Sequence, residues 1–177
     1  MKDIKDRINL FKNFKCPRWD DLPDKPVFGK NVIVFINSSL EGLIPERDYL
    51  TQNMIQNYSK WNIIPKIEGR KYGRNHIAYL MVITVFKELI NIADVHSGVK
   101  LMLSQYSDKE AYNLFAEIFE KAIRRTFSHV KDGKVYTFEG FEIDTHVAGL
   151  KIVSNSLALR LLGQMVLEQG GFDFLGE

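Results

Sequence analysis

Residues 51–83, TQNMIQNYSKWNIIPKIEGRKYGRNHIAYLMVI, decide the fold that we predict for this sequence. The stretch opens with a helix over about 51–62, because Thr51 is a good N-cap residue and apolar side chains follow it at helical spacing. Asn62 can end this helix, since asparagine tolerates the left-handed backbone conformation that often follows a helix. The sequence therefore predicts a short helix with a defined start and end.

The residues after this helix predict a small β-hairpin and then a long helix. Pro65 and Gly69 bracket a polar tip between apolar flanks, which is typical of a hairpin over about 64–73. From about Arg74 to Ile90 the apolar residues recur at the spacing of one helix face. That face consists of Ile77, Leu80, Met81, Thr84, Val85 and Leu89.

The segment before this stretch combines an arm with an element of ambiguous type. We expect a short amphipathic helix within residues 1–15. CPRWDDLPDKPVFG at 16–29 is typical of an extended arm, because its prolines disfavour helix, and Trp19 and Leu22 are expected to anchor it. KNVIVFINSSL at 30–40 is either a helix or a buried strand, and its β-branched residues alone favour a strand.

Most of the remaining chain predicts helices. We expect them over about 91–104, 107–127 and 144–168, with Ser107 as an N-cap residue. Short strands are expected on either side of the turn KDGK at 131–134.

The composition is that of a folded protein with one domain or two small ones. The 177 residues are 45% hydrophobic, 12% aromatic and 26% charged, with a formal net charge of +2. Cys16 is the only cysteine, which excludes an intramolecular disulfide and a cysteine metal knuckle. The charged N-terminus argues against a secretory signal, and no segment reaches the roughly 20 apolar residues of a membrane helix. We therefore expect a cytoplasmic protein that does not contact a membrane.

The sequence does not favour an enzyme. Its four histidines are scattered and lack metal-ligand spacing. EGFEIDTH at 139–146 gathers three carboxylates and a histidine, but no second cluster or placed nucleophile accompanies them, so a solvated turn is the preferred interpretation. GRKYGR at 69–74 lacks the spacing of a phosphate-binding loop. We expect neither catalysis nor a cofactor nor a metal ion.

Positive charge gathers around the helix at 51–62. Between Ser59 and Asn75 five lysines and arginines stand against Glu68 alone. Glutamine and asparagine can pair with an adenine edge through two hydrogen bonds, while lysine and arginine neutralise phosphates. An ordinary solvated helix surface has the same residue types, so this pattern alone favours DNA binding only weakly. The candidate DNA-binding residues are Gln52, Asn53, Gln56, Asn57, Lys60, Lys66, Arg70, Lys71 and Arg74.

The runs MIQNYSKWNIIPK at 54–66 and GRKYGRNHIAYLMVI at 69–83 resemble the head of MerR-type regulators. Those proteins show a Thr-Ile-Arg-x-Tyr helix, a Gly-Leu-Leu-x-Pro exit, an Arg-Arg-Tyr wing and a long helix. Ile55, Gln56 and Tyr58 stand at the matching helix positions. Residues 62–65 match the exit, 70–72 match the wing and 75–83 match the long helix.

The wider pattern is similar to an uncharacterised bacterial family of MerR-like proteins. Its members show a Trp-x-x-Leu-Pro arm, an Asn-Tyr-x-Lys helix and a Lys-Tyr-x-Arg-x-x-Ile-Ala-Tyr-Leu segment, which residues 18–23, 57–60 and 71–80 match. The resemblance covers about residues 18–103 and implies that residues 30–40 are the first helix of a helix-turn-helix. Two features depart from the MerR pattern: Gln56 replaces the usual arginine, and the loop EGLIPERDY is longer than a tight turn.

The resemblance implies a mostly α protein with a winged helix-turn-helix head and a helical C-terminal region. The helix at about 51–62 would lie in the major groove, with Gln56 and Tyr58 facing DNA. A wing at about 64–73 would hold the DNA backbone. The wing contacts would be Arg70, Lys71 and Tyr72. The implied segments are an N-terminal helix and arm (1–28), a winged helix-turn-helix domain (29–103) and a helical region for dimerisation or effector binding (104–177).

The expected function is sequence-specific binding of double-stranded DNA by a transcriptional regulator. A homodimer is expected because paired half-sites reward a two-fold protein. An unidentified small-molecule effector is a further possible partner. Six aromatic residues could line a pocket for it, but the preferred interpretation is that they form an ordinary core. These residues are Phe115, Phe119, Phe127, Tyr136, Phe138 and Phe141. The alternatives are a helical protein–protein adaptor without DNA binding and an excisionase-like architectural DNA-binding factor.

Overall fold

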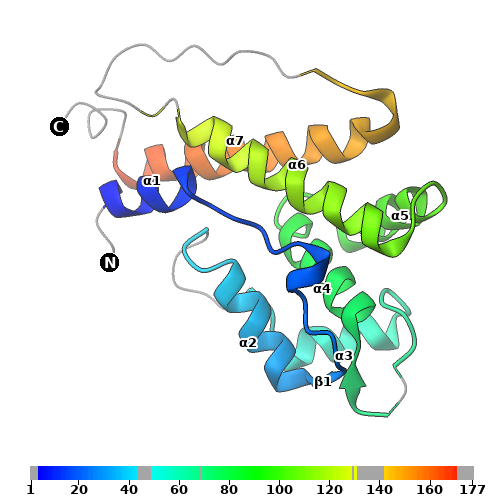
Figure 1. Cartoon of the computed structure of the whole chain (residues 1–177). Coiled ribbons are helices and arrows are strands. Elements are labelled where there is room, and N and C mark those ends of the chain that lie inside the picture. The colour runs from blue at the N-terminus through cyan, green and yellow to red at the C-terminus, as the bar shows by residue number, and fades with distance from the viewer. Residues whose placement is uncertain (1–3, 44–48, 68, 129, 131–141, 171–177) are drawn as a thin grey trace. The chain divides into compact units, whose positions relative to one another are not determined.

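The computed structural model describes residues 4–43, 49–67, 69–128, 130 and 142–170. Within these residues the chain forms seven α-helices and one two-stranded antiparallel sheet (Figure 1), which confirms the mostly α prediction. The strands expected around residues 131–134 lie almost wholly outside the described residues. By its internal contacts the chain divides into two compact units, which we call the head unit (residues 16–117) and the tail unit (residues 1–15 with 118–177).

The head unit contains the sheet and four complete helices. In chain order it consists of a 3₁₀ turn at Trp19–Asp21, β1 (Val27–Phe28), α2 (Gly29–Ser39), α3 (Gln52–Lys60), β2 (Lys71–Tyr72), α4 (Arg74–Phe86), α5 (Ile92–Leu103) and the first part of α6 (Asp108–Ser128). Helix α2 lies beside the sheet in Figure 1 and contacts both of its strands. It also contacts α3 and α4, so these elements form one packed group.

The ambiguous segment 30–40 folds as a helix. Val32, Ile36 and Leu40 are at most 1% exposed and stand four residues apart, which is the spacing of one helix face. Asn37 ties this helix to the residue at the end of the following loop. Its side chain accepts a hydrogen bond from the Leu50 N–H at 2.9 Å and donates one to the Leu50 carbonyl at 3.1 Å.

Helix α3 starts and ends where its local sequence predicts. The Thr51 hydroxyl accepts a hydrogen bond from the Met54 backbone N–H at 3.4 Å, as an N-cap residue does. Asn62 adopts a φ of 55°, the left-handed conformation expected just after the helix. The prediction of a short helix with these two boundary residues is confirmed.

Strand β2 pairs with β1, which corrects the prediction of a local hairpin over 64–73. In the register, Val27 faces Tyr72 and Phe28 faces Lys71. The Ile64 side chain is buried, and Pro65 has no backbone N–H to donate to a neighbouring strand. The N-terminal arm supplies the partner strand instead.

Helix α4 forms the centre of the head unit and is shorter than predicted. It ends at Phe86, not at about Ile90. The following helix has its own start signal, because the Asn91 side chain accepts a hydrogen bond from the Asp94 N–H at 2.9 Å. A turn therefore separates α4 from α5.

The tail unit is built around aromatic packing between distant parts of the chain. It contains α1 (Ile4–Lys12), the second part of α6, a 3₁₀ turn at Thr145–Val147 and α7 (Ala148–Glu168). The ring centroids of Phe11 and Phe127 lie 4.2 Å apart, and both side chains are 0% exposed. An ion pair of 2.8 Å between Arg7 and Glu168 joins α1 to α7.

One segment of the described chain, Thr145–Glu168, is long and apolar enough to cross a membrane by length and composition alone. In the structure 39% of its apolar window is buried. A core helix of a soluble protein satisfies the same criterion, so the finding is weak evidence for a membrane span.

Candidate nucleic-acid interface

Helix α3 has one buried side and one polar exposed side. Ile55 and Tyr58 are 0% and 3% exposed and anchor the helix in the head unit. The side chains on the opposite arc are exposed, and their spacing places them on one helix surface. They are Gln52, Asn53, Gln56, Asn57 and Lys60, which we call the amide face.

Tyr58 does not belong to the amide face, which corrects its expected position toward DNA. Its side chain is buried, and burial, followed by the negative charge of Glu88, raises the pKa of its phenol. Tyr58 stands three residues from Ile55, so it shares the buried side of the helix. Its ring is part of the core of the head unit.

Tyr72 also lies below the surface, which corrects its expected grip on a DNA backbone. Its side chain is 8% exposed, and burial raises the pKa of its phenol, whereas a hydrogen bond with the Gln52 side chain lowers it. A Cβ added at Gly29 would lie 3.1 Å from Gln52 Oε1 and 3.3 Å from Tyr72 Cε2. Because Gly29 has no side chain, the start of α2 leaves room for Gln52 and Tyr72. Tyr72 therefore supports Gln52 from the buried side.

Basic side chains lie in loop 62–70 and on β2. Lys66, Arg70 and Lys71 are exposed, as expected for residues that meet a charged partner. The ammonium of Lys71 lies 5.3 Å from the centroid of the Phe28 ring on the neighbouring strand, which is a cation–π distance. This contact directs Lys71 along the outer side of the sheet.

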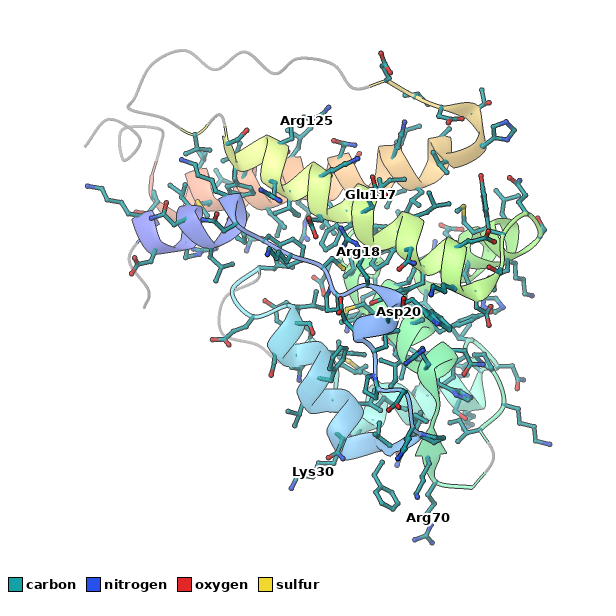
Figure 2. The ribbon with its side chains drawn as sticks, in the orientation of Figure 1. Arg18, Asp20, Lys30, Arg70, Glu117 and Arg125 are labelled. Atoms are coloured by element: carbon teal, nitrogen blue, oxygen red, sulfur yellow. The ribbon has the colours of Figure 1, made fainter. Side chains whose placement is uncertain are left out.

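Lys30 is a further exposed cation that the sequence reasoning missed. It stands at the second residue of α2, and Figure 2 shows it at the same end of the head unit as Arg70. The segment 30–40 is ambiguous between helix and strand from its sequence, so the outward direction of Lys30 follows only from the folded helix.

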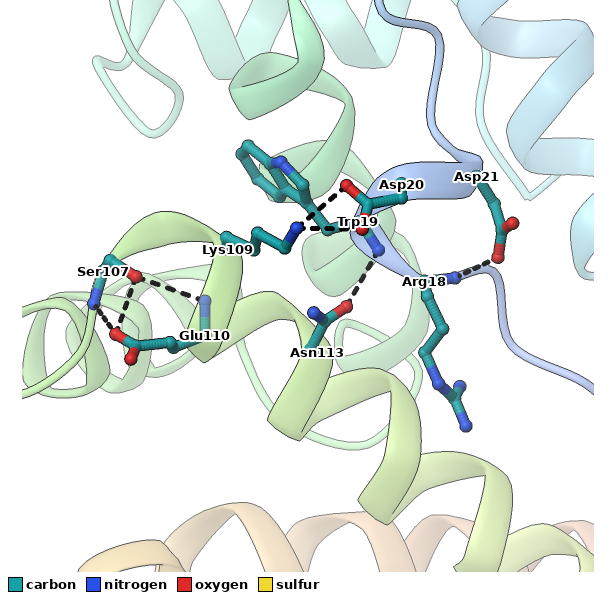
Figure 3. A network of polar contacts seen from close by, with 8 residues as sticks. All are labelled: Arg18, Trp19, Asp20, Asp21, Ser107, Lys109, Glu110 and Asn113. Carbon is teal, nitrogen blue, oxygen red and sulfur yellow. Dashed lines mark hydrogen bonds and ion pairs between the residues drawn. The ribbon is translucent and has the colours of Figure 1, made fainter.

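Arg74 is engaged inside the head unit. Its guanidinium carbon lies 5.9 Å from the centroid of the Trp19 ring. The backbone N–H of Trp19 donates a hydrogen bond to Asn113 Oδ1 at 2.8 Å (Figure 3). Lys109 pairs with Asp20 at 2.8 Å, and its hydrogen bond, together with the positive charges of Lys109 and Arg74, lowers the pKa of the Asp20 carboxyl. Arg74 therefore helps to hold the arm, and this role competes with a DNA contact.

No group of three or more histidine, cysteine, aspartate or glutamate side chains suited to a metal ion occurs in the described part of the chain. Of the segment 139–146, the structure describes the residues from Glu142 onward. There the Asp144 side chain accepts a hydrogen bond from the His146 backbone N–H at 3.0 Å and caps a 3₁₀ turn. This geometry gives Asp144 a local structural role.

The comparisons with known proteins concern mainly the head unit. Residues 17–121 match the family model described as Domain of unknown function (DUF1836), and this range includes the whole amide face. No curated protein and no solved structure matches the chain. Because the matched residues make up more than half of the sequence, the chain belongs to the DUF1836 family of domains of unknown function.

Proposed function

We propose that this chain is a sequence-specific DNA-binding transcriptional regulator whose helix α3 reads bases in the major groove. The amide face carries the proposal. An α-helix fits the major groove, and glutamine and asparagine can each pair with an adenine edge through two hydrogen bonds. Asn53, Gln56 and Asn57 are exposed on that face, and Ile55 fixes the opposite side of the helix in the core.

The elements around α3 support a winged helix-turn-helix arrangement. Helices α2 and α3 form the helix pair, and the contact between Asn37 and Leu50 fixes the end of their connection. Loop 62–70 and the β1–β2 sheet take the place of a wing. Lys66, Arg70 and Lys71 would contact phosphates there, and Lys30 would add a contact from the start of α2.

A cytoplasmic homodimer is part of the proposal, because a two-fold symmetric protein matches two equivalent DNA half-sites. Residues 104–177 are the proposed region for dimerisation or for a small-molecule effector. Phe115, Phe119 and Phe127 are at most 3% exposed and act as core residues, so they do not support an effector pocket. The other aromatic candidates, Tyr136, Phe138 and Phe141, lie outside the described residues.

Fluorescence anisotropy on the upstream DNA of the protein's own gene, with excess nonspecific competitor, tests the proposal. We expect binding that survives the competitor. The double variant Arg70→Ala/Lys71→Ala should reduce the slope of log affinity against log salt concentration by about two, since each lost phosphate contact contributes about 0.9. The matched control is Lys15→Ala/Lys100→Ala, which removes two exposed charges elsewhere and should keep the wild-type slope.

A protein adaptor is the second candidate, because two large apolar side chains near the amide face are exposed. Phe28 and Trp61 are each 55% exposed, and exposed aromatic residues often mark protein interfaces. The absence of DNA binding by the wild type would favour this candidate. Strong DNA bending without an effect on a promoter would instead favour an excisionase-like factor.

A further inference from the structure

Gln52, the first residue of α3, forms a hydrogen bond with the side chain of Tyr72 on β2. Gln52 is exposed, whereas Tyr72 is 8% exposed. Burial raises the pKa of the Tyr72 phenol, and the hydrogen bond with Gln52 lowers it. A hydrogen bond lowers the pKa of a phenol when its donor stabilises the phenolate, so the Gln52 amide N–H donates to the phenol oxygen.

The surroundings of Tyr72 fix the position of its ring. Tyr72 is paired with Val27 in the two-stranded sheet. Its ring also meets the imidazole of His76, on the first turn of α4, edge to face at a centroid distance of 6.1 Å. A Cβ added at Gly29 would lie 3.1 Å from Gln52 Oε1 and 3.3 Å from Tyr72 Cε2. The Gln52 amide therefore has a fixed ring and the start of α2 as its neighbours.

The hydrogen bond with Tyr72 does not exhaust the bonding groups of the Gln52 side chain. A glutamine amide has two N–H groups and a carbonyl oxygen that can accept two hydrogen bonds. One N–H donated to the phenol leaves a second N–H and the carbonyl oxygen. In the major groove adenine offers an acceptor at N7 and a donor at N6, which match this remaining pair.

We infer that Tyr72 is a positioning residue that holds the Gln52 amide ready to pair with one adenine of the bound DNA. This inference rests on the proposed function, in which α3 lies in the major groove, where the first residues of a recognition helix contact base edges. A side chain that is already held in its binding orientation loses less conformational entropy on binding. Tyr72 thus contributes to specificity without contacting DNA.

The first part of the test uses the full chain without DNA. Tyr72→Phe removes the hydroxyl and keeps the ring beside Gly29 and His76. We expect the side-chain NH₂ signals of Gln52 to shift in NMR spectra and to exchange faster with water, while those of Gln56 stay unchanged. The matched control is Tyr106→Phe, which removes a hydroxyl elsewhere in the head unit and should leave both glutamines unchanged. Gln52 signals that do not respond to Tyr72→Phe would overturn the inference.

Gly29→Ala tests the same arrangement with the Tyr72 hydroxyl intact. Its added methyl group would lie 3.1 Å from Gln52 Oε1, which is tighter than an ordinary contact, so the amide must move. We expect the Gln52 side-chain signals to shift. Gly98→Ala is the control, because an added Cβ at that helical glycine of α5 meets no atom within 4 Å. The same response to both variants would overturn the placement of the amide against Gly29.

The second part measures competition binding on DNA sites with single base changes. Gln52→Ala should lower discrimination at one A·T pair at least about fivefold. Tyr72→Phe should lower it about two- to tenfold at the same pair, which is the ordering cost of one long side chain, and should keep the affinity for unrelated DNA. In the Gln52→Ala background, Tyr72→Phe should have no further effect at that pair. An equal loss in that background, or a uniform loss over all sequences, would overturn the inference.

The two parts separate this inference from the proposed function. If the wild type discriminates between bases and Tyr72→Phe discriminates equally well, the positioning role is wrong and the proposed function stands. If the wild type binds no DNA, the proposed function is rejected together with the base-reading role of Gln52, whatever the NMR signals show.

Discussion

Helices α3 and α7 each bury one side in their own unit, but their exposed sides have opposite chemistry. The amide face of α3 carries four amides and a lysine. Helix α7 exposes Ile152, Leu159 and Leu167, which are 44%, 46% and 81% exposed and lie seven and eight residues apart, on one side of the helix.

If the chain binds partners as proposed, these two exposed sides suit different kinds of surface. An apolar surface gains free energy by leaving water against another apolar surface. An amide gains little by burial unless its partner offers matching donors and acceptors. Within the proposed function, we therefore expect α3 to read bases and α7 to form the contact between the two copies of the homodimer.

The largest expected effect tests whether the tail unit depends on its own core. Phe127→Ala should lower the free energy of unfolding by about 3–5 kcal/mol, because it leaves a cavity where two phenyl rings pack. Urea unfolding followed by far-UV circular dichroism measures the loss. The control Ile143→Ala, at a 53% exposed position of the tail unit outside α7, should change stability by less than about 0.5 kcal/mol. Equal losses would contradict a core centred on Phe127.

The assignment of α7 to dimerisation predicts the next largest effect. Leu159→Glu should raise the dissociation constant of the homodimer at least about tenfold, since burial of a leucine is worth about 1.5–3 kcal/mol. Sedimentation equilibrium measures it. Leu101→Glu makes the same chemical change at a 62% exposed leucine of the head unit and should leave the dimer intact. If only Leu101→Glu dissociates the dimer, the contrast between α3 and α7 is wrong.

The amide face predicts a smaller effect that concerns specificity. Gln56→Ala should remove about 1–3 kcal/mol of discrimination at one base pair, because a bidentate pair with adenine is worth that much. Affinity for unrelated DNA should stay nearly the same. Competition binding on operators with single base changes measures this, and Gln105→Ala, at an exposed glutamine outside α3, is the control. A uniform loss over all sequences would indicate that Gln56 only positions the protein.

The helices could be predicted because their signals act over a few residues. Thr51 and Asn62 delimit α3 by contacts and conformations within one turn of chain. Once that helix is placed, its 3.6-residue period decides which amides share a face. The same period places Tyr58 on the side of Ile55, so its burial could be predicted from the sequence alone. The resemblance instead implied that Tyr58 faces DNA.

The sheet and the support of the site depend on contacts between distant residues. β1 and β2 have two residues each, which is too short for a pattern of alternating burial to predict their pairing. The position of Tyr72 beneath Gln52 follows from that pairing, and so does the space that Gly29 leaves for both. The contact between His76 Nε2 and the backbone carbonyl of Lys66 likewise depends on the path of the chain between them in the folded protein.

The start of α6 provides the smallest and most local test. The Glu110 carboxylate accepts hydrogen bonds from the Ser107 N–H at 3.0 Å and the Ser107 hydroxyl at 2.7 Å (Figure 3). These two bonds, the hydroxyl first, lower the pKa of Glu110 below its ordinary value of 4.5. The interaction therefore stabilises the fold above the pKa of the unfolded glutamate, and this contribution is lost as the pH falls through the lower pKa of the folded state.

Glu110→Gln should reduce the stability slightly at neutral pH. The stabilities of the variant and the wild type should converge as the pH falls below the lowered pKa of the folded Glu110, where both side chains are uncharged. Urea midpoints measured as a function of pH check this, with Asp24→Asn, at an exposed residue of the arm, as the control for removing one carboxylate. Because Glu110 lies on neither the amide face nor the apolar side of α7, its replacement should leave base discrimination and dimerisation unchanged. A change in either would show that the start of α6 influences a partner surface, and that the two surfaces cannot be assigned from α3 and α7 alone.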